Sequence, residues 1–315
     1  LTALEVRDAE RFAALAADET FVSVAIAATQ AAFRARHEEK RLLLANAVEC
    51  SATGIDIEPD LQLAFVRFVE LGATRGHDVQ LRDKKAFLAG DFRQVDIVCL
   101  KSHIDDDQVW RMIDAQGLRA VNARAACLAC SERSRLDSIL RNGGARTPRS
   151  AARADEVDRL SYPIIRKSNS LAAPRDIRVL HRPPLEIDCE CYFYQEMILS
   201  DGAVYKVYCI GAEAFLVKET DADVDVEVDA AAAAPADEQG ARRQMAPISA
   251  RLAEAARKVG RLTGLEVYGV DFVGTAEEMF VIDVNPFPSF RALPQAADAL
   301  WDYLENIRVA DAEKR

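Results

Sequence analysis

The chain has 315 residues, enough for two or three lobes, and 50% of them are hydrophobic and 29% charged. Its formal net charge of -11 argues against a surface for nucleic acid or anionic membranes. No apolar run approaches the roughly 18 residues of a membrane span, and the first residues include acids rather than a basic signal-peptide head, so we expect a cytoplasmic protein.

The first part of the chain changes character near residue 41. Residues 1–40 are rich in Ala, Glu and Arg and predict a helical N-terminal extension, to which the sequence assigns no task. Residues 41–122 then alternate strand-like runs, "RLLLAN", "HDVQLRD", "VDIVCLK" and "RAVN", with a helical stretch after the first of them. This alternation is typical of βαβ units and predicts a small α/β lobe with a parallel sheet.

The middle of the chain carries a lysine at a strand end. "SERSRLDSILRNGGARTP" predicts a helix that begins at Ser131 and ends before two glycines. "YPIIRK" predicts a strand ending in Arg166 and Lys167, and a loop of polar and small residues follows. A lysine beside such a loop can bind phosphate together with the loop amides, although lysines at strand ends are also common without any ligand.

The seven cysteines are an odd number and favour reduced thiols. Cys127 with Cys130 forms a C-x-x-C pattern and Cys189 with Cys191 a C-x-C pattern, and four thiolates could hold zinc. However, the first pair lies in an Ala-rich segment that predicts a helix, and the second pair begins a predicted strand. Free cysteine is often a buried small residue, so we leave a metal or redox role as the alternative.

The last third predicts strands, an insert, a helix and a hairpin. "CYFYQEMILSDGAVYKVYCIG" predicts two strands around a turn at residues 200–202. Residues 219–247 are acidic and Ala-rich and predict a mobile insert. "ISARLAEAARKVGRLTG" predicts an amphipathic helix that Gly264 ends. It leads into a hairpin of Tyr268–Val273 and Met279–Val284.

The hairpin places acids among apolar residues. Side chains alternate faces along a strand, so Asp283 and Asn285 share a face, and pairing across the turn brings Asp271 onto it. Two buried carboxylates so placed would repel each other, and a hard divalent cation removes that cost. Oxygen ligands suit Mg²⁺ or Mn²⁺. The alternative is an exposed hairpin whose acids face water.

From about residue 41 onward, the order of these parts resembles the ATP-grasp superfamily. "YPIIRK" is similar to its strand-end lysine motif, "YQEMI" to the hinge between its clasping lobes, and "YGVDFV" with "VIDVNPFPSF" to its metal-binding strands. The resemblance implies an α/β and α+β fold, with the α/β lobe at 41–122 and an ATP-grasp domain at 123–315. In that domain, a central lobe at about 150–197 and a C-terminal lobe at 198–315 would clasp ATP.

The resemblance also implies site residues. Lys167 would contact the ATP phosphates, and Mg²⁺ or Mn²⁺ would be bound by Asp271, Asp283 and Asn285. The residues expected to border the adenine, partly through backbone groups, are Gln195, Glu196, Met197 and Ile198. Lys206 is at the position where ligases commonly carry an arginine that meets the transferred phosphate. Arg291, just after the metal strand, is our candidate for binding a substrate carboxylate.

Most of the superfamily joins a carboxylate to an amine through an acyl phosphate, so the resemblance favours such a ligase, with small-molecule substrates and neither nucleic acid nor a membrane as partner. A homodimer is compatible with the sequence. "ERSRLDSIL", "VYKVYCIG" and the Asp-x-Asn-x-Phe-Pro ending are similar to inositol polyphosphate kinases instead, and a small-molecule kinase is the alternative. Such a kinase needs several cations, which Arg166, Arg175 and Arg178 could supply in part. A second alternative is a nucleotide-binding regulator without turnover.

Overall fold

The computed structural model of the chain describes residues 44–47, 59–82, 84–90, 92, 95–101, 104–171, 176–221, 241–275, 278–290 and 292–312. The chain divides into two compact units. Unit 1 contains the described residues up to Val121 and from Ser289 onward, and unit 2 is Asn122–Pro288. The helical extension expected at residues 1–40 lies outside the described residues. Within the described part, no helix is both long and apolar enough to cross a bilayer.

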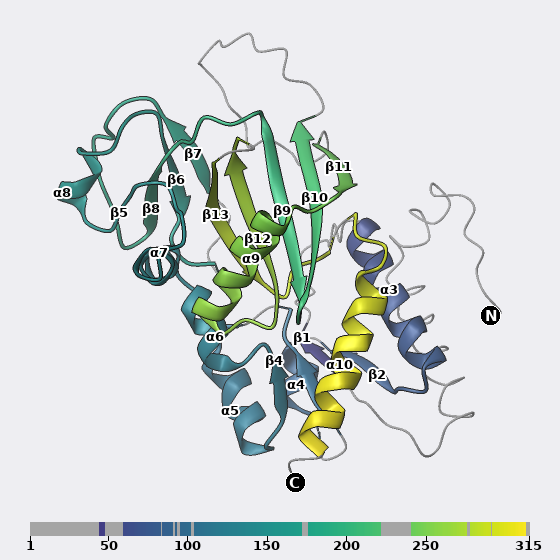
Figure 1. Ribbon diagram of the computed structural model, residues 1–315. Coiled ribbons are helices and arrows are strands. Elements are labelled where there is room, and N and C mark those ends of the chain that lie inside the picture. Colours follow the sequence, from purple (N-terminus) through teal and green to yellow (C-terminus); the bar gives the residue numbers. More distant parts are fainter. Residues whose placement is uncertain are drawn as a thin grey trace. The chain divides into compact units, whose positions relative to one another are not determined.

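Unit 1 contains a parallel four-stranded sheet in the order β2-β1-β3-β4 (Figure 1). The strands are β1 (Leu44–Ala47), β2 (Val79–Arg82), β3 (Ile97–Cys99) and β4 (Arg119–Val121). The helices between them are α3 (Pro59–Thr74), α4 (Lys84–Leu88) and α5 (Asp107–Ala115). The parallel sheet predicted from the strand and helix alternation is therefore confirmed.

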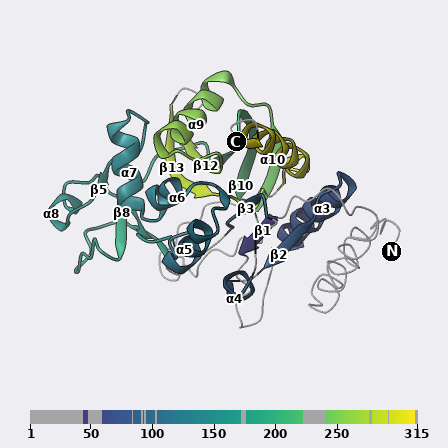
Figure 2. The same cartoon turned by 90° about the horizontal axis from the view of Figure 1, so that it is seen from below.

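The C-terminal helix α10 (Ala296–Ala312) also belongs to unit 1, where it packs against α3 (Figure 2). The sequence had placed this segment in the C-terminal lobe. Trp301 of α10 is completely buried, stacks on the Phe68 ring at 4.7 Å and donates its indole N–H to the Phe68 carbonyl at 2.8 Å. This aromatic contact fixes α10 to the N-terminal lobe although more than two hundred residues separate the two segments.

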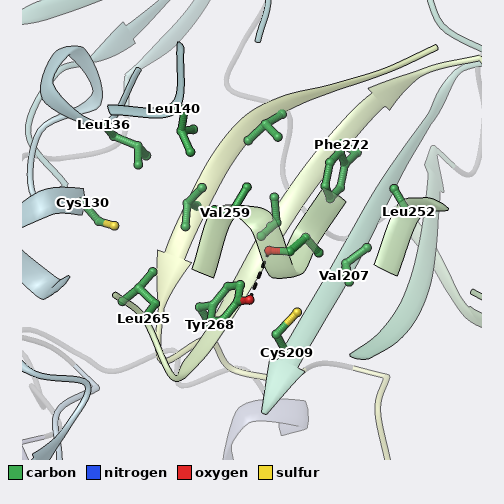
Figure 3. Packing of buried hydrophobic residues seen from close by; sticks show 14 of the residues in the cluster. Cys130, Leu136, Leu140, Val207, Cys209, Leu252, Val259, Leu265, Tyr268 and Phe272 are labelled. Atoms are coloured by element: carbon green, nitrogen blue, oxygen red, sulfur yellow. Dashed lines mark hydrogen bonds between the residues drawn. The ribbon is translucent and has the colours of Figure 1, made fainter. Parts of the chain in front are cut away.

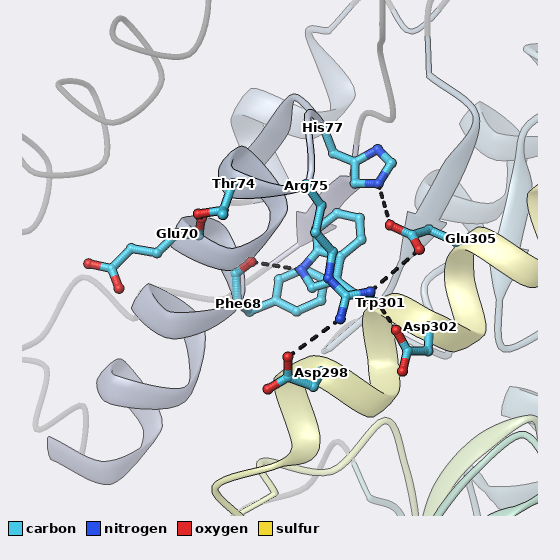
Figure 4. A network of polar contacts seen from close by, with 9 residues as sticks. All are labelled: Phe68, Glu70, Thr74, Arg75, His77, Asp298, Trp301, Asp302 and Glu305. Carbon is cyan, nitrogen blue, oxygen red and sulfur yellow. Dashed lines mark hydrogen bonds and ion pairs between the residues drawn. The ribbon is translucent and has the colours of Figure 1, made fainter. Parts of the chain in front are cut away.

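Polar contacts surround this aromatic stack (Figure 4). The guanidinium of Arg75 pairs with Asp302 at 2.5 Å and also with two further acids of α10, Asp298 and Glu305. His77 lies flat on Trp301 with ring centroids 4.7 Å apart, and its Nε2 is 2.7 Å from a Glu305 oxygen. Isolated surface pairs contribute little, so we attribute the attachment of α10 mainly to the buried rings.

Gly72 of α3 makes the close approach of Trp301 possible. A Cβ added at Gly72 would overlap the Trp301 ring and would lie 2.7 Å from the Val79 side chain. We expect Gly72→Ala to lower the free energy of unfolding of unit 1 by about 1–3 kcal/mol, since overpacking a core costs about that much. Both tryptophans of the chain, Trp110 and Trp301, lie in unit 1, so urea unfolding followed by tryptophan fluorescence measures this change.

The control for this variant is Thr74→Ala, at an exposed position of the same helix. Its unfolding free energy should stay within roughly 0.5 kcal/mol of the wild-type value. Equal effects of the two variants would contradict the steric explanation.

Unit 2 contains two antiparallel sheets (Figure 1). The smaller has the order β5-β8-β6-β7, with β5 (Ser150–Ala151), β6 (Ile164–Ser168), β7 (Ile177–Leu180) and β8 (Tyr192–Glu196). The larger has the order β11-β10-β9-β12-β13, with β9 (Ala203–Ile210), β10 (Glu213–Asp221), β11 (Ala241–Ala246), β12 (Val267–Gly274) and β13 (Met279–Pro286). The helices are α6 (Arg124–Cys130), α7 (Arg133–Asn142), α8 (Ala154–Val157) and α9 (Ala250–Thr263).

One face of the larger sheet is covered by α9 and forms the main core of unit 2 (Figure 3). Ser249 caps the start of α9, and Gly264, in the left-handed conformation at φ 77°, ends it as the sequence predicted. The apolar side of α9 meets the alternate residues Tyr268, Val270 and Phe272 of β12. Because side chains alternate along a strand, Asp271 lies on the opposite face.

Both strands predicted around residues 200–202 are present, but they do not pair with each other, because β8 belongs to the smaller sheet and β9 to the larger. Two other local predictions differ from the structure. The interval 219–247 is not wholly an insert, since Glu219–Asp221 continues β10 and pairs with Ala241–Arg243 of β11; residues 222–240 lie outside the described part. The helix α7 begins after Glu132 rather than at Ser131, whose hydroxyl instead donates to the Leu128 carbonyl.

Candidate functional site

A β-bulge in the hairpin of β12 and β13 links the two sheets of unit 2. The register pairs Asp271 with Asp283 and then Phe272 with Val281, so Ile282 has no direct partner on β12. The carbonyl of Ile282 accepts a hydrogen bond from Lys167 Nζ of β6 at 3.0 Å. Lys167 also donates to Gln195 Oε1 at 3.2 Å and is 6% exposed. The strand-end lysine therefore lies next to the acidic end of the hairpin.

A row of charged side chains crosses the face of the larger sheet that is opposite α9. From β11 to β12, Arg243 pairs with Glu219 at 2.6 Å, Glu219 lies 3.8 Å from Lys206, and Lys206 pairs with Asp271 at 3.1 Å. The next residue in the register is Asp283 of β13. The charges alternate in sign up to this point, and Asp271 with Asp283 is the one step in the row that joins two carboxylates.

Asp283 has an unused acceptor. Its Oδ2 is 3.4 Å from the guanidinium of Arg133, at the start of α7, while its Oδ1 is buried and has no hydrogen-bond partner among the described residues. Such an oxygen is costly to bury. Asn285 is two positions further along β13, so it lies on the same face as Asp283.

The pKa shifts show which charge the site accommodates. Burial raises the pKa of Asp271, and the neighbouring Asp283 raises it further, against the opposing effect of Lys206. Burial lowers the pKa of Lys206, but Asp271 and Glu219 more than offset this, so its pKa is raised. The raised pKa of Asp271 thus comes first from its burial, and the raised pKa of Lys206 comes from its two neighbouring carboxylates.

The residues present fit a hard divalent cation. Two facing carboxylates, one of which has an orphaned oxygen, and a nearby amide oxygen form an oxygen-only donor set of the kind that Mg²⁺ or Mn²⁺ takes. Within the described residues, no group of three or more His, Cys, Asp or Glu side chains is placed to hold a metal. A metal at this hairpin would therefore need Asn285, as predicted, and further ligands from phosphate or water.

The residues expected to border adenine lie at the end of β8. Gln195 is 3% exposed and its side-chain oxygen accepts a hydrogen bond from Lys167, whereas Met197 is 45% exposed. The backbone N–H of Glu196 donates to the Arg149 carbonyl at 2.8 Å, and that of Met197 to the Pro163 carbonyl at 3.2 Å. Ile198 follows in the segment that leads to β9.

An apolar strip lies on the same face of the smaller sheet as Lys167. Ile177 of β7 pairs directly with Lys167, and Val179 pairs with Ile165. Ile177 and Val179 are 46% and 47% exposed. Exposed apolar side chains beside a lysine can bind a flat ring with attached phosphates.

A small cavity of about 20 Å³, partly open to solvent, lies between the two sheets and α7. Polar groups converge in it from Gln195, Asp283 and Arg133. Its remaining lining residues are Leu136, Asp137, Leu140, Thr147, Phe193, Val281 and Ile282. The cavity thus joins the nucleotide residues predicted on β8 to the metal residues predicted on β13.

Sequence reasoning did not single out Arg133 as a site residue. Its guanidinium donates to the Ser168 carbonyl and to Asp283, so it links the loop after Lys167 to β13. The start of its helix is capped by Asn169, whose Oδ1 accepts from the Ser134 N–H at 2.9 Å. The segment "ERSRLDSIL" contained this arginine, but its partners are 35 and 150 residues away.

The remaining predicted cations have different outcomes. Arg166 and Arg178 both pair with Asp176, at 2.6 and 3.1 Å. Arg291 and Arg175 lie outside the described residues, so their roles remain predictions.

Three cysteines of unit 2 are buried, unpaired thiols. Cys127 and Cys130 are free, buried residues in and beside the core, and burial raises the pKa of each to about 12. Cys209 is likewise buried, with a pKa raised to about 11. The C-x-x-C pair is therefore protonated at neutral pH, which is unfavourable for zinc binding or thiol exchange.

These pKa values predict selective alkylation. At pH 8 the thiolate fraction of Cys127, Cys130 and Cys209 is small and the side chains are buried, whereas Cys191 is exposed. We expect iodoacetamide to modify Cys191 in the folded protein and to leave the three buried thiols unmodified until urea is added, as read by peptide mass spectrometry. Modification of Cys127 in the folded state would contradict this picture.

Comparison with solved structures identifies the fold. The chain is similar to D-alanine–D-alanine ligase from Bacillus anthracis, with a TM-score of 0.64 and 15% identity over 86% of this chain and 99% of that one. It is also similar to a RimK domain ATP-grasp protein from Sphaerobacter thermophilus, with a TM-score of 0.56 and 17% identity over 84% of this chain and 99% of that one. The ATP-grasp ligase PsnB gives a TM-score of 0.58 and 16% identity over 84% of this chain and 99% of that one.

Sequence comparison gives a match to only part of the chain. No family model matches the chain. Inositol-tetrakisphosphate 1-kinase 3 of Oryza sativa subsp. indica is 27% identical over 176 residues, which cover 50% of this chain and 47% of the kinase. The chain thus spans about half the length of the curated relatives it matches. The fold predicted from the order of motifs is confirmed, and the chain has the ATP-grasp fold.

Proposed function

We propose that the protein is an ATP-dependent ligase that joins a carboxylate to an amine through an acyl phosphate. The observation that carries this proposal is the pair Asp271 and Asp283, in direct register, with Lys206 on one side and Lys167 nearby. Acids and lysines in this arrangement are suited to a metal-bound triphosphate. The ATP-grasp fold supports the same nucleotide.

Each group has a role in this proposal. Asp271, Asp283 and Asn285 would hold Mg²⁺, which when bound withdraws charge from phosphate oxygens. Lys167 and Lys206 neutralise charge that develops during phosphoryl transfer. Gln195, Glu196, Met197 and Ile198, with Ile177 and Val179, provide the surface for the purine ring. Arg291 is proposed to bind the substrate carboxylate.

The reaction needs no nucleophile from the protein. The substrate carboxylate attacks the γ-phosphorus of ATP, the bond to the β–γ bridging oxygen breaks, and ADP leaves. The amine then attacks the acyl carbon. The bond between this carbon and the phosphate oxygen breaks, inorganic phosphate leaves with that oxygen and the bonding electron pair, and the nitrogen loses a proton. Positioning and electrostatic stabilisation by the residues above account for the catalysis.

A small-molecule kinase that phosphorylates a hydroxyl is the second candidate, because the curated relative is an inositol phosphate kinase. A highly phosphorylated substrate requires several cations that are not already neutralised. Around the described site, Arg243, Lys206, Arg133 and Arg166 each pair with a carboxylate. This pairing favours the ligase.

One experiment separates the candidates. The protein is incubated with ATP, Mg²⁺ and mixtures of amino acids, small metabolic acids, amines and phosphorylated polyols, and both free phosphate and product mass are measured. A ligase releases phosphate and gives a product lighter by one water than its two substrates. A kinase gives ADP, no free phosphate and a product heavier by one phosphoryl group. ATP binding without either product would support the nucleotide-binding regulator.

A further inference from the structure

The two carboxylates of the candidate metal site are each held by a cation of the protein itself. Lys206 Nζ lies 3.1 Å from Asp271 Oδ2, and the Arg133 guanidinium lies 3.4 Å from Asp283 Oδ2. None of these side chains is well exposed: Lys206 and Asp271 are 21% and 15% exposed, and Arg133 and Asp283 are 14% and 22% exposed. The pairs are therefore less screened by water than surface pairs.

Both carboxylates therefore already have a cation partner in the protein. A divalent cation arriving alone would compete with Lys206 for Asp271 and with Arg133 for Asp283, and it would leave those two cations without their carboxylates. A divalent cation arriving on a triphosphate brings more negative charge than positive.

We propose that Arg133 and Lys206 act as internal counter-ions that keep free divalent metal out of the site, so that the metal is accepted only together with nucleotide phosphate. Phosphate oxygens then take over the two cations and leave Asp271 and Asp283 to the metal. Arg133 is suited to this exchange because it spans from Asp283 to the carbonyl of Ser168, directly after Lys167. The inference rests on the proposed function, because it requires the metal site at this hairpin.

The test measures the Mn²⁺ retained with the protein after ultrafiltration, first without nucleotide and then with a non-hydrolysable ATP analogue, which passes the membrane together with its Mn²⁺ when it is not bound to protein. We expect the wild type to bind Mn²⁺ only with the analogue. Without nucleotide, Arg133→Met and Lys206→Met should each bind Mn²⁺ about tenfold or more tightly than the wild type, since an adjacent cation changes the affinity of a carboxylate by at least that factor.

The matched control is Arg135→Met, which removes an exposed arginine from the same helix, and it should bind Mn²⁺ like the wild type. Arg133→Lys keeps the charge and should do the same. Adding Asp283→Asn to Arg133→Met should remove the gain, which shows that the new binding uses this carboxylate. Circular dichroism of every variant checks that the fold is retained.

The possible failures are distinguishable. If Mn²⁺ binds with the analogue but neither Met variant gains affinity without it, the counter-ion proposal is overturned and the proposed function survives. If the wild type binds Mn²⁺ equally well with and without the analogue, the counter-ion proposal is again wrong. If Mn²⁺ binds to no form of the protein under either condition, the metal site, and with it the proposed function, is overturned as well.

Discussion

Asp283→Ala should reduce ATP-dependent turnover by about a thousandfold or more, since a catalytic metal supplies several kcal/mol of charge stabilisation in the transition state. Asp283 carries the orphaned oxygen of the site and faces Asp271. Its removal also ends the repulsion between the two acids, which offsets the lost pair with Arg133. We therefore expect the thermal unfolding midpoint to change by only a few degrees while product formation disappears.

The matched control is Glu254→Gln, which removes an exposed acid of α9 that pairs only with Arg261 among the described residues. Its turnover should equal that of the wild type. An Asp283→Ala variant that retains wild-type turnover would remove the basis for a metal at this hairpin. A variant that loses turnover only because it unfolds would be recognised from its circular dichroism spectrum.

Asn122→Ala should lower the free energy of unfolding of unit 2 by about 3 kcal/mol, because it leaves two backbone N–H groups without acceptors and each orphaned group costs about 1–3 kcal/mol. Asn122 is 1% exposed. Its Oδ1 accepts from the N–H groups of Glu266 and Val267, at 2.7 and 2.8 Å, and its Nδ2 donates to the Val267 carbonyl at 2.8 Å. It thus fixes the start of β12, the strand that carries Asp271.

Tryptophan fluorescence cannot follow this change, because both tryptophans lie in unit 1. Hydrogen exchange of the β12 amides and far-ultraviolet circular dichroism during urea unfolding are the appropriate measurements. Asn142→Ala, at the exposed end of α7, is the control and should change stability by no more than roughly 0.5 kcal/mol. If Asn122→Ala lowers the free energy of unfolding by less than about 1 kcal/mol, water must replace the hydrogen bonds that the Asn122 side chain makes.

Local patterns predicted much of the fold and part of the site. Strand and helix alternation predicted the parallel sheet, and the apolar periodicity with Gly264 predicted α9 and its end. The period of two along β13 placed Asp283 and Asn285 on one face, whereas the direct pairing of Asp271 with Asp283 comes from the bulge at Ile282, which the turn length does not predict. The predicted features depend on residues close together in the chain, so the sequence contains all the information they need.

Longer-range features were not readable from local patterns. The sequence predicted two strands near residues 200–202 but not that they join different sheets. It placed Glu219 in an insert, whereas the strand pairing brings it beside Lys206. It also gave no reason for α10 to pack on α3, which depends on Gly72 making room for Trp301.

The sequence by itself therefore determined the element types, the presence of the hairpin and the chemical nature of the proposed ligands, because backbone periodicity and turn residues act over a few residues. Only the tertiary structure decided which cation meets which acid. Arg133 reaches Asp283 across 150 residues, and Lys167 reaches the Ile282 carbonyl across 115, at a bulge that exposes it. Such contacts form where separate elements pack together, and no local pattern encodes the partner.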